Sequence, residues 1–132
     1  MRISPAETGL TGWLEQSAQE FQELSGIPVN FQEIDVRIDL PSEIQAQLIR
    51  IVQEALSNIR KHAAASRVSL ICRQLDADLV LEIHDDGRGF APEDEPVASQ
   101  HGLRGMRERA DLIGADFQVI SRPDEGTIVR IR

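Results

Sequence analysis

Three polar side chains recur at helical intervals in the middle of this chain: Glu54, Asn58 and Lys61, with His62 beside them. Intervals of four and three residues place side chains in one stripe along a helix, close enough to contact a single ligand. Asparagine is mildly unfavourable inside a helix, but its side-chain carbonyl oxygen is a suitable ligand for Mg²⁺, which needs few protein contacts. The stripe therefore indicates either a metal-assisted site or, in the simpler interpretation, a solvated polar face.

A second candidate is the sequence DDGRG at 85–89, which directly follows a segment that alternates like a strand. The carboxylate of Asp85 would lie where the chain turns away from the sheet. Gly87 and Gly89 would let the backbone approach a flat ligand closely. An acidic turn that binds nothing is the alternative interpretation.

Two further glycine motifs lie downstream. The sequence HGLRGM at 101–106 places Gly102 and Gly105 at the predicted start of a helix, where free N–H groups and the helix dipole favour phosphate oxygens. A helix entrance that merely contains glycine is the alternative. Gly126 and Thr127 give a weaker signal, because glycine is expected in the turn of a hairpin in any case.

Three predicted helices carry many of these residues, over 8–24, 42–62 and 103–113. In the first helix, apolar residues recur at three- and four-residue intervals at Leu10, Trp13, Leu14, Ala18, Phe21 and Leu24. The second helix has a broad apolar face formed by Ile44, Leu48, Ile51, Val52, Ala55 and Ile59. Ser42 is predicted to cap the start of the second helix, and Gly114 to end the third.

Alternating segments predict five strands, over 27–34, 67–75, 79–84, 117–121 and 127–131. Turns rich in Asp, Pro and Gly join the second strand to the third and the fourth to the fifth, as in hairpins. The segment 86–101 is broken by Gly and Pro, so we expect a mobile loop there, with 90–100 acting as a lid. The order of the elements predicts an α+β fold, a two-layer sandwich with three helices on one face of a mixed sheet of about five strands. The pattern leaves the strand order open.

Composition predicts one globular domain over 1–132. The chain is 41% hydrophobic and 27% charged, values that argue against disorder. No apolar run approaches the roughly 20 residues needed to span a bilayer, and the signal-peptide pattern is absent, so the domain is expected to be cytoplasmic. A net charge of −8 disfavours nonspecific binding to nucleic acids or anionic membranes. The single cysteine, Cys72, excludes a disulfide within one chain.

The motifs, taken in order, resemble a known family. The sequence RIVQEALSNIRKHA at 50–63 resembles the N box of sensor histidine kinases, particularly the nitrate/nitrite-sensor subfamily. DDGRG resembles the D-x-G-x-G box, HGLRGM the second glycine box, and EGT at 125–127 the final G-T element. The resemblance covers about residues 10 to 132. It implies the ATP-binding sandwich shared by histidine kinases, gyrase, the large heat-shock chaperones and mismatch-repair ATPases.

In that family pattern, Asn58 coordinates Mg²⁺ and Glu54 supports the metal and the phosphate chemistry. Lys61 and His62 lie toward the phosphates, and the resemblance makes Glu54 and Lys61 the catalytic pair. The cofactors it implies are ATP and Mg²⁺. Phosphoryl transfer asks little covalent chemistry of a protein, so the expected mechanism is positioning and charge neutralisation of the γ-phosphoryl group.

The resemblance also assigns the base and the phosphates to particular residues. Asp85 would accept a hydrogen bond from the adenine amino group, and Thr127 would assist directly or through water. Guanine presents a carbonyl oxygen at that place, so the carboxylate would reject GTP. The backbone at Gly87 and Gly89 would pass close to the base. The second glycine box would receive the phosphates at Gly102, Leu103, Gly105 and Met106.

The pattern lacks one part of such kinases, the dimerising helical hairpin with its acceptor histidine. His62, His84 and His101 all fall in other contexts, so we expect no self-phosphorylation by the isolated domain, which should be monomeric. The expected function is transfer of the γ-phosphoryl group to a histidine on the dimerisation domain of the parent chain, a membrane-bound sensor, for relay to a response regulator. The alternatives are a serine kinase acting on a sigma-factor antagonist, and a nucleotide-dependent binding module or ATPase without kinase activity, in which Glu54 activates water.

Overall fold

The computed structural model describes residues 5–89 and 97–132, and the side chains of 9–89 and 102–132. It contains α1 (Pro5–Ser25), α2 (Ser42–Asn58) and α3 (Val97–Leu112). The last turn of α2 continues as a π-helix, η1 (Ile59–Ala63). Gly9 interrupts α1 with a φ of 74° and a ψ of 175°, a conformation accessible essentially to glycine alone.

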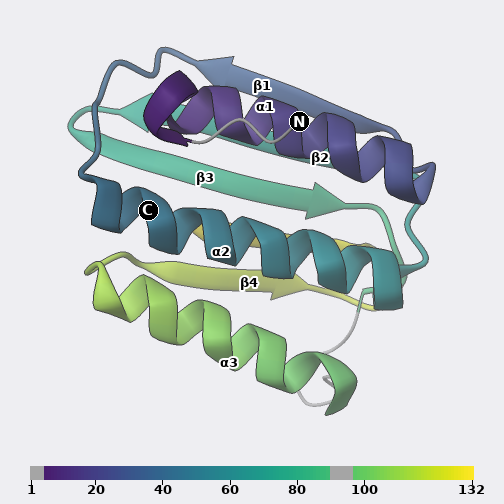
Figure 1. Cartoon of the computed structure of the whole chain (residues 1–132). Helices are drawn as coiled ribbons and strands as arrows, with labels where there is room; N and C mark the ends of the chain where they lie inside the picture. Colours follow the sequence, from purple (N-terminus) through teal and green to yellow (C-terminus); the bar gives the residue numbers. More distant parts are fainter. Residues whose placement is uncertain (1–4, 90–96) are drawn as a thin grey trace.

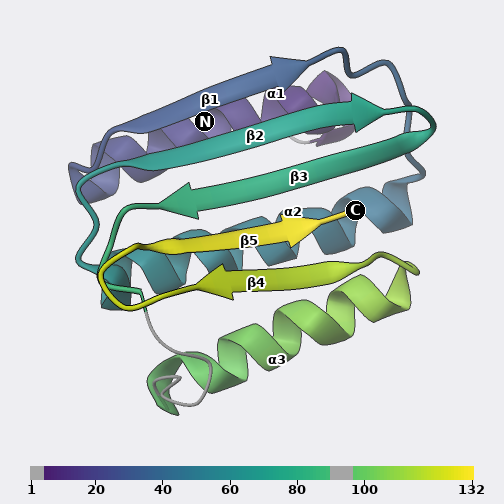
Figure 2. The same ribbon diagram turned by 180° about the vertical axis from the view of Figure 1, so that it is seen from behind.

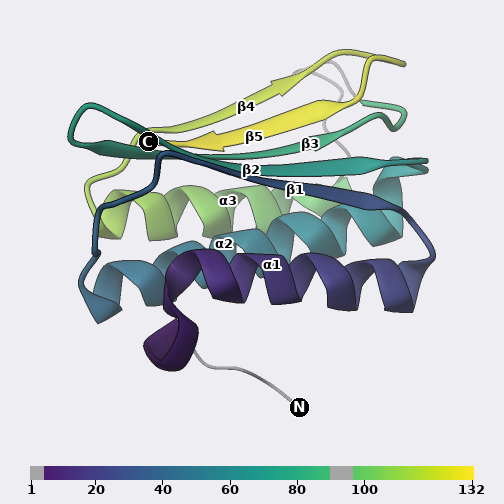
Figure 3. The same cartoon turned by 90° about the horizontal axis from the view of Figure 1, so that it is seen from above.

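Five strands form one sheet: β1 (Val29–Ile34), β2 (Val68–Leu75), β3 (Asp78–Asp85), β4 (Phe117–Ser121) and β5 (Thr127–Ile131). Their order across the sheet is β1-β2-β3-β5-β4, so the last strand lies between the third and the fourth. β1 pairs with β2 in parallel, whereas the other pairs are antiparallel. All three helices lie on the near side of the sheet in Figure 1, and on its far side in the view from behind in Figure 2. Figure 3 shows that they cover one face only, which confirms the predicted two-layer sandwich.

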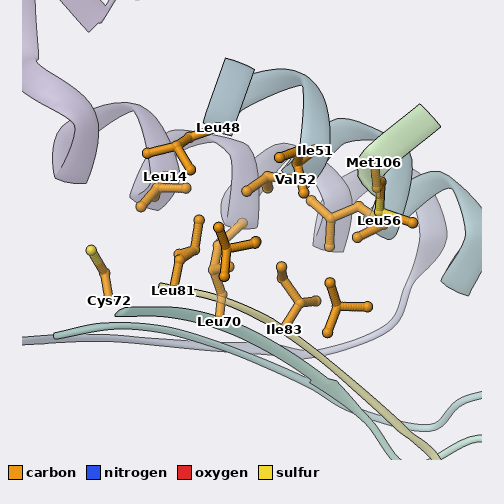
Figure 4. Packing of buried hydrophobic residues seen from close by; sticks show 14 of the residues in the cluster. Leu14, Leu48, Ile51, Val52, Leu56, Leu70, Cys72, Leu81, Ile83 and Met106 are labelled. Atoms are coloured by element: carbon orange, nitrogen blue, oxygen red, sulfur yellow. The ribbon is translucent and has the colours of Figure 1, made fainter. Parts of the chain in front are cut away.

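The core lies between the helices and the covered face of the sheet. Helix side chains such as Leu14 and Ile51 point toward sheet side chains such as Leu70, Leu81 and Ile83, and all five are at most 1% exposed (Figure 4). Burial of each such side chain contributes on the order of 2 kcal/mol, which holds α2 in a fixed position over the strands. The predicted apolar face of the second helix is therefore the face that packs on the sheet.

Several predicted boundaries differ from the structure. α3 begins at Val97, not near residue 103, so 97–100 belong to a helix and not to a lid. Residues 90–96, the remainder of the predicted lid, lie outside the described residues. Ser42 makes no side-chain cap for α2; the carbonyl of Pro41 accepts from the N–H groups of Ile44 and Gln45 instead. A proline carbonyl can satisfy the first helical donors, so a hydroxyl cap is not required.

The turns agree better with the prediction. Asp76 begins the turn between β2 and β3 with a φ of 56°, a region that aspartate tolerates better than most residues. Gly114 has a φ of 66° and follows the end of α3. Among residues 5–89 and 97–132, no helix is both long and apolar enough to cross a membrane.

Candidate functional site

A narrow slot lies between α2, α3 and the sheet, where η1 continues α2. Its cavity volume is about 60 Å³. That is space for roughly four to six water molecules, on the order of one flat bicyclic ring. Apolar side chains form most of its wall: Ala55, Ile59, Ala63, Ile83, Leu103, Met106 and Val129. Gly89 and the polar groups of Asn58, His62, Asp85, Arg88 and Thr127 complete the lining. A flat, largely apolar ligand with a few polar atoms fits this composition.

Asp85 is the acidic group of the slot. It ends β3 directly opposite Thr127 of β5, and its Oδ1 accepts the N–H of Gly87 at 2.8 Å. Burial is the main cause that raises the pKa of Asp85 above its ordinary value, and the charge of Asp86 adds to it. Hydrogen bonds from Gly87 and Thr127 and the nearby His84 offset part of this rise. A half-buried carboxylate of this kind gains stability from any ligand that donates a hydrogen bond to it.

Asp86, the next residue, has a different role. Its carboxylate accepts the backbone N–H groups of Ser66 at 2.8 Å and Arg67 at 3.0 Å, and the hydroxyl of Ser66. The hydroxyl of Ser66 is the main cause that lowers the pKa of Asp86. Asp86 therefore holds the loop before β2, and it is not among the residues that line the slot.

Three glycines pack the chain tightly around Asp85. A Cβ atom on Gly87 would collide with the carbonyl of Ala63, one on Gly89 with the carbonyl of Arg122, and one on Gly126 with the carbonyl of Asp85 itself. Gly89 and Gly126 also have φ values of 58° and 77°. These glycines bring three backbone segments together around the carboxylate. Contacts within the protein already require glycine at these three positions, and the close approach of Gly87 and Gly89 to a ligand stays a prediction.

A second, wider cavity lies between α2 and α3, with a volume of about 620 Å³. We call it the cleft; it is lined by Arg50, Gln53, Glu54, Gly102, Gly105, Met106 and Arg109. Met106 lines the slot as well, so the two cavities adjoin. Gly102 packs on α2 at this point: a Cβ atom there would meet Oε1 of Glu54, and would lie 3.0 Å from Nδ2 of Asn58. The slot and the cleft together form one extended, divided site.

Most of the predicted site residues line one of the two cavities: Glu54, Asn58, His62, Asp85, Gly89, Gly102, Leu103, Gly105, Met106 and Thr127. Gly87 lies behind Asp85 and lines neither cavity. Lys61 also lines neither and is exposed to solvent. The helical wheel fails at Lys61 because η1 closes i→i+5 hydrogen bonds, and these change the angular position of each residue.

The predicted reason for phosphate binding at the second glycine box is wrong. α3 begins at Val97, so Gly102 and Gly105 lie inside the helix and not at its start. Only the first four N–H groups of an α-helix are free of intrahelical bonds. Because the two glycines have no side chains, they leave room for the cleft between α3 and α2.

Sequence reasoning missed four polar lining residues, Arg88 in the slot and Arg50, Gln53 and Arg109 in the cleft. The signal for two of them was present: Arg50 precedes Glu54 by one helical turn, and Arg109 follows Gly105 by one. Within the described part of the chain, no group of three or more His, Cys, Asp and Glu side chains could hold a metal. Glu54 and Asn58 offer one carboxylate and one amide oxygen, a small donor set of the kind that Mg²⁺ accepts when a ligand supplies further oxygens.

Comparisons with known proteins identify the family of this chain. Residues 43–132 match the family described as histidine kinase-, DNA gyrase B- and HSP90-like ATPase. The signal transduction histidine-protein kinase/phosphatase DegS of Brevibacillus brevis is 33% identical over 130 residues, which cover 98% of this chain and 33% of that protein. The sensor protein VraS of Staphylococcus aureus is 41% identical over 93 residues, which cover 70% of this chain and 26% of VraS. The chain thus spans about a third or less of the length of these relatives.

Solved structures agree on the fold. The histidine kinase domain of the Erythrobacter litoralis EL346 blue-light activated histidine kinase superposes with a TM-score of 0.70 at 26% identity, covering 92% of this chain and 63% of that one. The Acinetobacter baumannii histidine kinase AdeS, at 13% identity, superposes with a TM-score of 0.68 over 94% of this chain and 62% of its own, which supports the fold alone. The family match spans more than half of the sequence, and it includes α2, β3 and α3, which carry residues that line the two cavities. This chain therefore belongs to the family of histidine kinase-, DNA gyrase B- and HSP90-like ATPases.

Proposed function

We propose that this chain binds Mg²⁺-ATP and donates the γ-phosphoryl group to a histidine on a separate dimerisation domain, for relay to a response regulator. The observation that carries the proposal is Asp85, a half-buried carboxylate with a raised pKa at the end of an apolar slot of base size. The adjoining cleft holds Glu54 and continues away from the slot. This arrangement suits a ligand with a flat apolar end and a charged, extended tail.

Base selection follows from the chemistry of Asp85. The exocyclic amino group of adenine would donate a hydrogen bond to the carboxylate of Asp85. This bond would stabilise the charged form of Asp85, which burial disfavours. Guanine offers a carbonyl oxygen in the same position, and two acceptors facing each other leave both without a partner. The hydroxyl of Thr127, which lies 2.8 Å from the hydroxyl of Ser121, would complete the polar end of the slot.

The cleft side of the site would handle the phosphates. Asn58 and Glu54 would hold Mg²⁺, which when bound neutralises phosphate charge. Both side chains are half-buried and lie against Gly102 of α3, so their orientation is restricted by packing. The remaining contribution of the chain is to orient the γ-phosphoryl group toward an incoming acceptor and to limit access of water.

Calorimetric titration with ADP and GDP, with and without Mg²⁺, tests the nucleotide site. Selective binding of ADP supports the proposal, and equal or absent binding of both nucleotides contradicts it. Transfer is then tested by adding ATP and the histidine-bearing dimerisation domain of the parent chain, and by following acid-labile phosphate on that domain. Steady release of phosphate without any partner would favour an ATPase, and phosphoserine on an added partner would favour a serine kinase.

The wording of the N box supports a finer proposal, that the parent chain is a sensor kinase of the nitrate/nitrite-sensor type. The parent would then supply the dimerisation hairpin and a sensor segment, anchored in the membrane, with this domain on the cytoplasmic side where ATP is found. We expect the isolated domain, 1–132, to be a monomer. A mass by light scattering near twice that of the chain, 14.7 kDa, would contradict this expectation.

A further inference from the structure

The cationic side chains around the two cavities are not those that the sequence motifs suggest. Among the described lysine and arginine residues, Arg88 lines the slot, and Arg50 and Arg109 line the cleft. Lys61, the cation of the N box, lines neither cavity. The arginines are therefore better placed than the lysine to meet the charged tail of a ligand that begins in the slot.

Arg50 continues the line of polar groups along α2. It precedes Glu54 by four residues and Asn58 by eight, which corresponds to about 6 Å and about 12 Å along the helix axis. A tail that leaves the slot beside Asn58 and follows α2 therefore passes Glu54 first and reaches Arg50 last. The position of Arg50 suits the far end of an extended polyphosphate.

Arg109 approaches the same end of the cleft from the facing helix. Its Nη1 donates to Oε1 of Gln47 at 3.2 Å, so α3 is linked to α2 by this side chain. Gln47 precedes Arg50 by three residues, one turn along the same helix. The bond to Gln47 holds the guanidinium of Arg109 at the end of the cleft where Arg50 also lies.

The local charge contrasts with that of the whole chain. Two arginines and one carboxylate, Glu54, line the cleft, which gives it a formal charge of +1 in a protein whose net charge is −8. Gly105 lies between Gly102 and Arg109 on α3, and apart from its own helix backbone and its two neighbours no atom of the described residues lies within 4 Å of the position that a Cβ would take there. An open, positively charged cleft on an acidic protein selects for an anion.

We infer that Arg50 and Arg109 bind the terminal phosphates of the nucleotide and supply the charge neutralisation that the motif resemblance assigns to Lys61. The inference rests on the proposed function, because it needs the nucleotide base in the slot. Guanidinium groups present several N–H donors in a planar fork that matches phosphate oxygens. Two of them on facing helices would bind the tail from both sides and fix the direction of the γ-phosphoryl group.

The test compares AMP, ADP and ATP by calorimetry, in EDTA and again with Mg²⁺, on the wild-type chain and on Arg50→Gln and Arg109→Gln. Each change should weaken ATP by roughly ten-fold or more in EDTA, the loss of one charge-assisted contact, while AMP changes less than about two-fold. The matched control is Arg104→Gln, which removes an exposed arginine from α3 that lines neither cavity. Thermal unfolding of each variant establishes that the fold is retained.

Three results would overturn the inference: an unchanged ATP affinity in both arginine variants, equal weakening of AMP and ATP, or a ten-fold loss of ATP affinity in Lys61→Gln alone. Gln47→Ala gives a second measurement. It keeps both arginine charges but releases Arg109, so it should weaken ATP less than Arg109→Gln does. Failure of the proposed function is distinguishable, because the wild-type chain would then bind none of the three nucleotides.

Discussion

Replacing Asp85 by Asn changes the charge of the slot with little change in shape. One oxygen of Asp85 accepts the N–H of Gly87 at 2.8 Å, and the amide oxygen of Asn can keep that bond. The amide NH₂ group would then turn toward the slot. It is a donor, and it would face the amino group of adenine, another donor, where the wild-type protein presents an acceptor.

The magnitude follows from the bonds exchanged. A hydrogen bond to a charged group contributes about 1.5–3 kcal/mol, and an unpaired donor left in the slot adds a desolvation cost of similar size. We expect a net loss of about 3 kcal/mol for ADP, a rise in Kd of roughly 150-fold. GDP should gain, because its carbonyl oxygen can accept from the new NH₂ group, so the preference for adenine over guanine should narrow or reverse.

Stability should move in the opposite direction. The folded-state pKa of Asp85 is raised, so its contribution to stability is full below the ordinary value of 3.8 and is lost as pH rises through the folded-state pKa. At pH 7 the wild-type chain therefore carries a charge that folding disfavours. Asp85→Asn should unfold at an equal or higher temperature than wild type at pH 7, and this advantage should vanish in acid.

Calorimetry with ADP and GDP, together with thermal unfolding at two pH values, measures both effects. Asp86→Asn is the matched control, because it removes an adjacent carboxylate that binds Ser66 and Arg67 outside the slot. It should lower stability and leave the ratio of ADP to GDP affinity unchanged. An Asp85→Asn variant that keeps its wild-type affinity for ADP would refute the assignment of the slot to the base.

Further predictions concern the helix facing the site, the core and the open face of the sheet. Gly105→Ala should raise the free energy of unfolding by about 0.5–1 kcal/mol, because alanine favours a helix more than glycine does and the new methyl group would contact no described atom within 4 Å beyond its own helix backbone and its two neighbours. Gly102→Ala should lose that gain, because its methyl group would collide with the carboxylate of Glu54 on α2. Urea titration measures both changes. Cys72 is fully buried, and burial is the main cause that raises its pKa to about 12, so a thiol reagent at pH 8 should label it only as fast as the chain unfolds. Burial tends to raise the pKa of Glu82, but the hydrogen bond from Arg130 at 2.7 Å and the nearby positive charges lower it overall. Arg130→Met should therefore destabilise the chain by about 1–2 kcal/mol at pH 7, and by less in acid as the pH falls through the lowered folded-state pKa of Glu82; a loss that does not shrink as the pH falls would contradict this reasoning.

Local periodicity was sufficient to predict the type of every described helix and strand except η1, which was predicted as part of an ordinary helix. The apolar residues of the second helix could be placed in the core because a period of 3.6 residues per turn brings them to one face of the helix. This holds whichever element packs against that face. Boundaries were less certain where competing signals met. The predicted start of the third helix was too late because glycines and prolines over 86–101 suggested a loop, whereas α3 begins at Val97, directly after the second of these prolines.

The sequence by itself determined the helices, the strands, the covered face of the sheet and the acidic turn at Asp85, because each depends on residues close together in the chain. Tertiary structure alone decided that β5 lies between β3 and β4, which places Thr127 opposite Asp85. Tertiary structure also decided which cationic side chains line the cleft. The π-helix η1 alters the angular position of Lys61, and packing of α3 on α2 brings Arg109 to Gln47. These features depend on contacts between segments up to 62 residues apart, and no local pattern encodes such contacts.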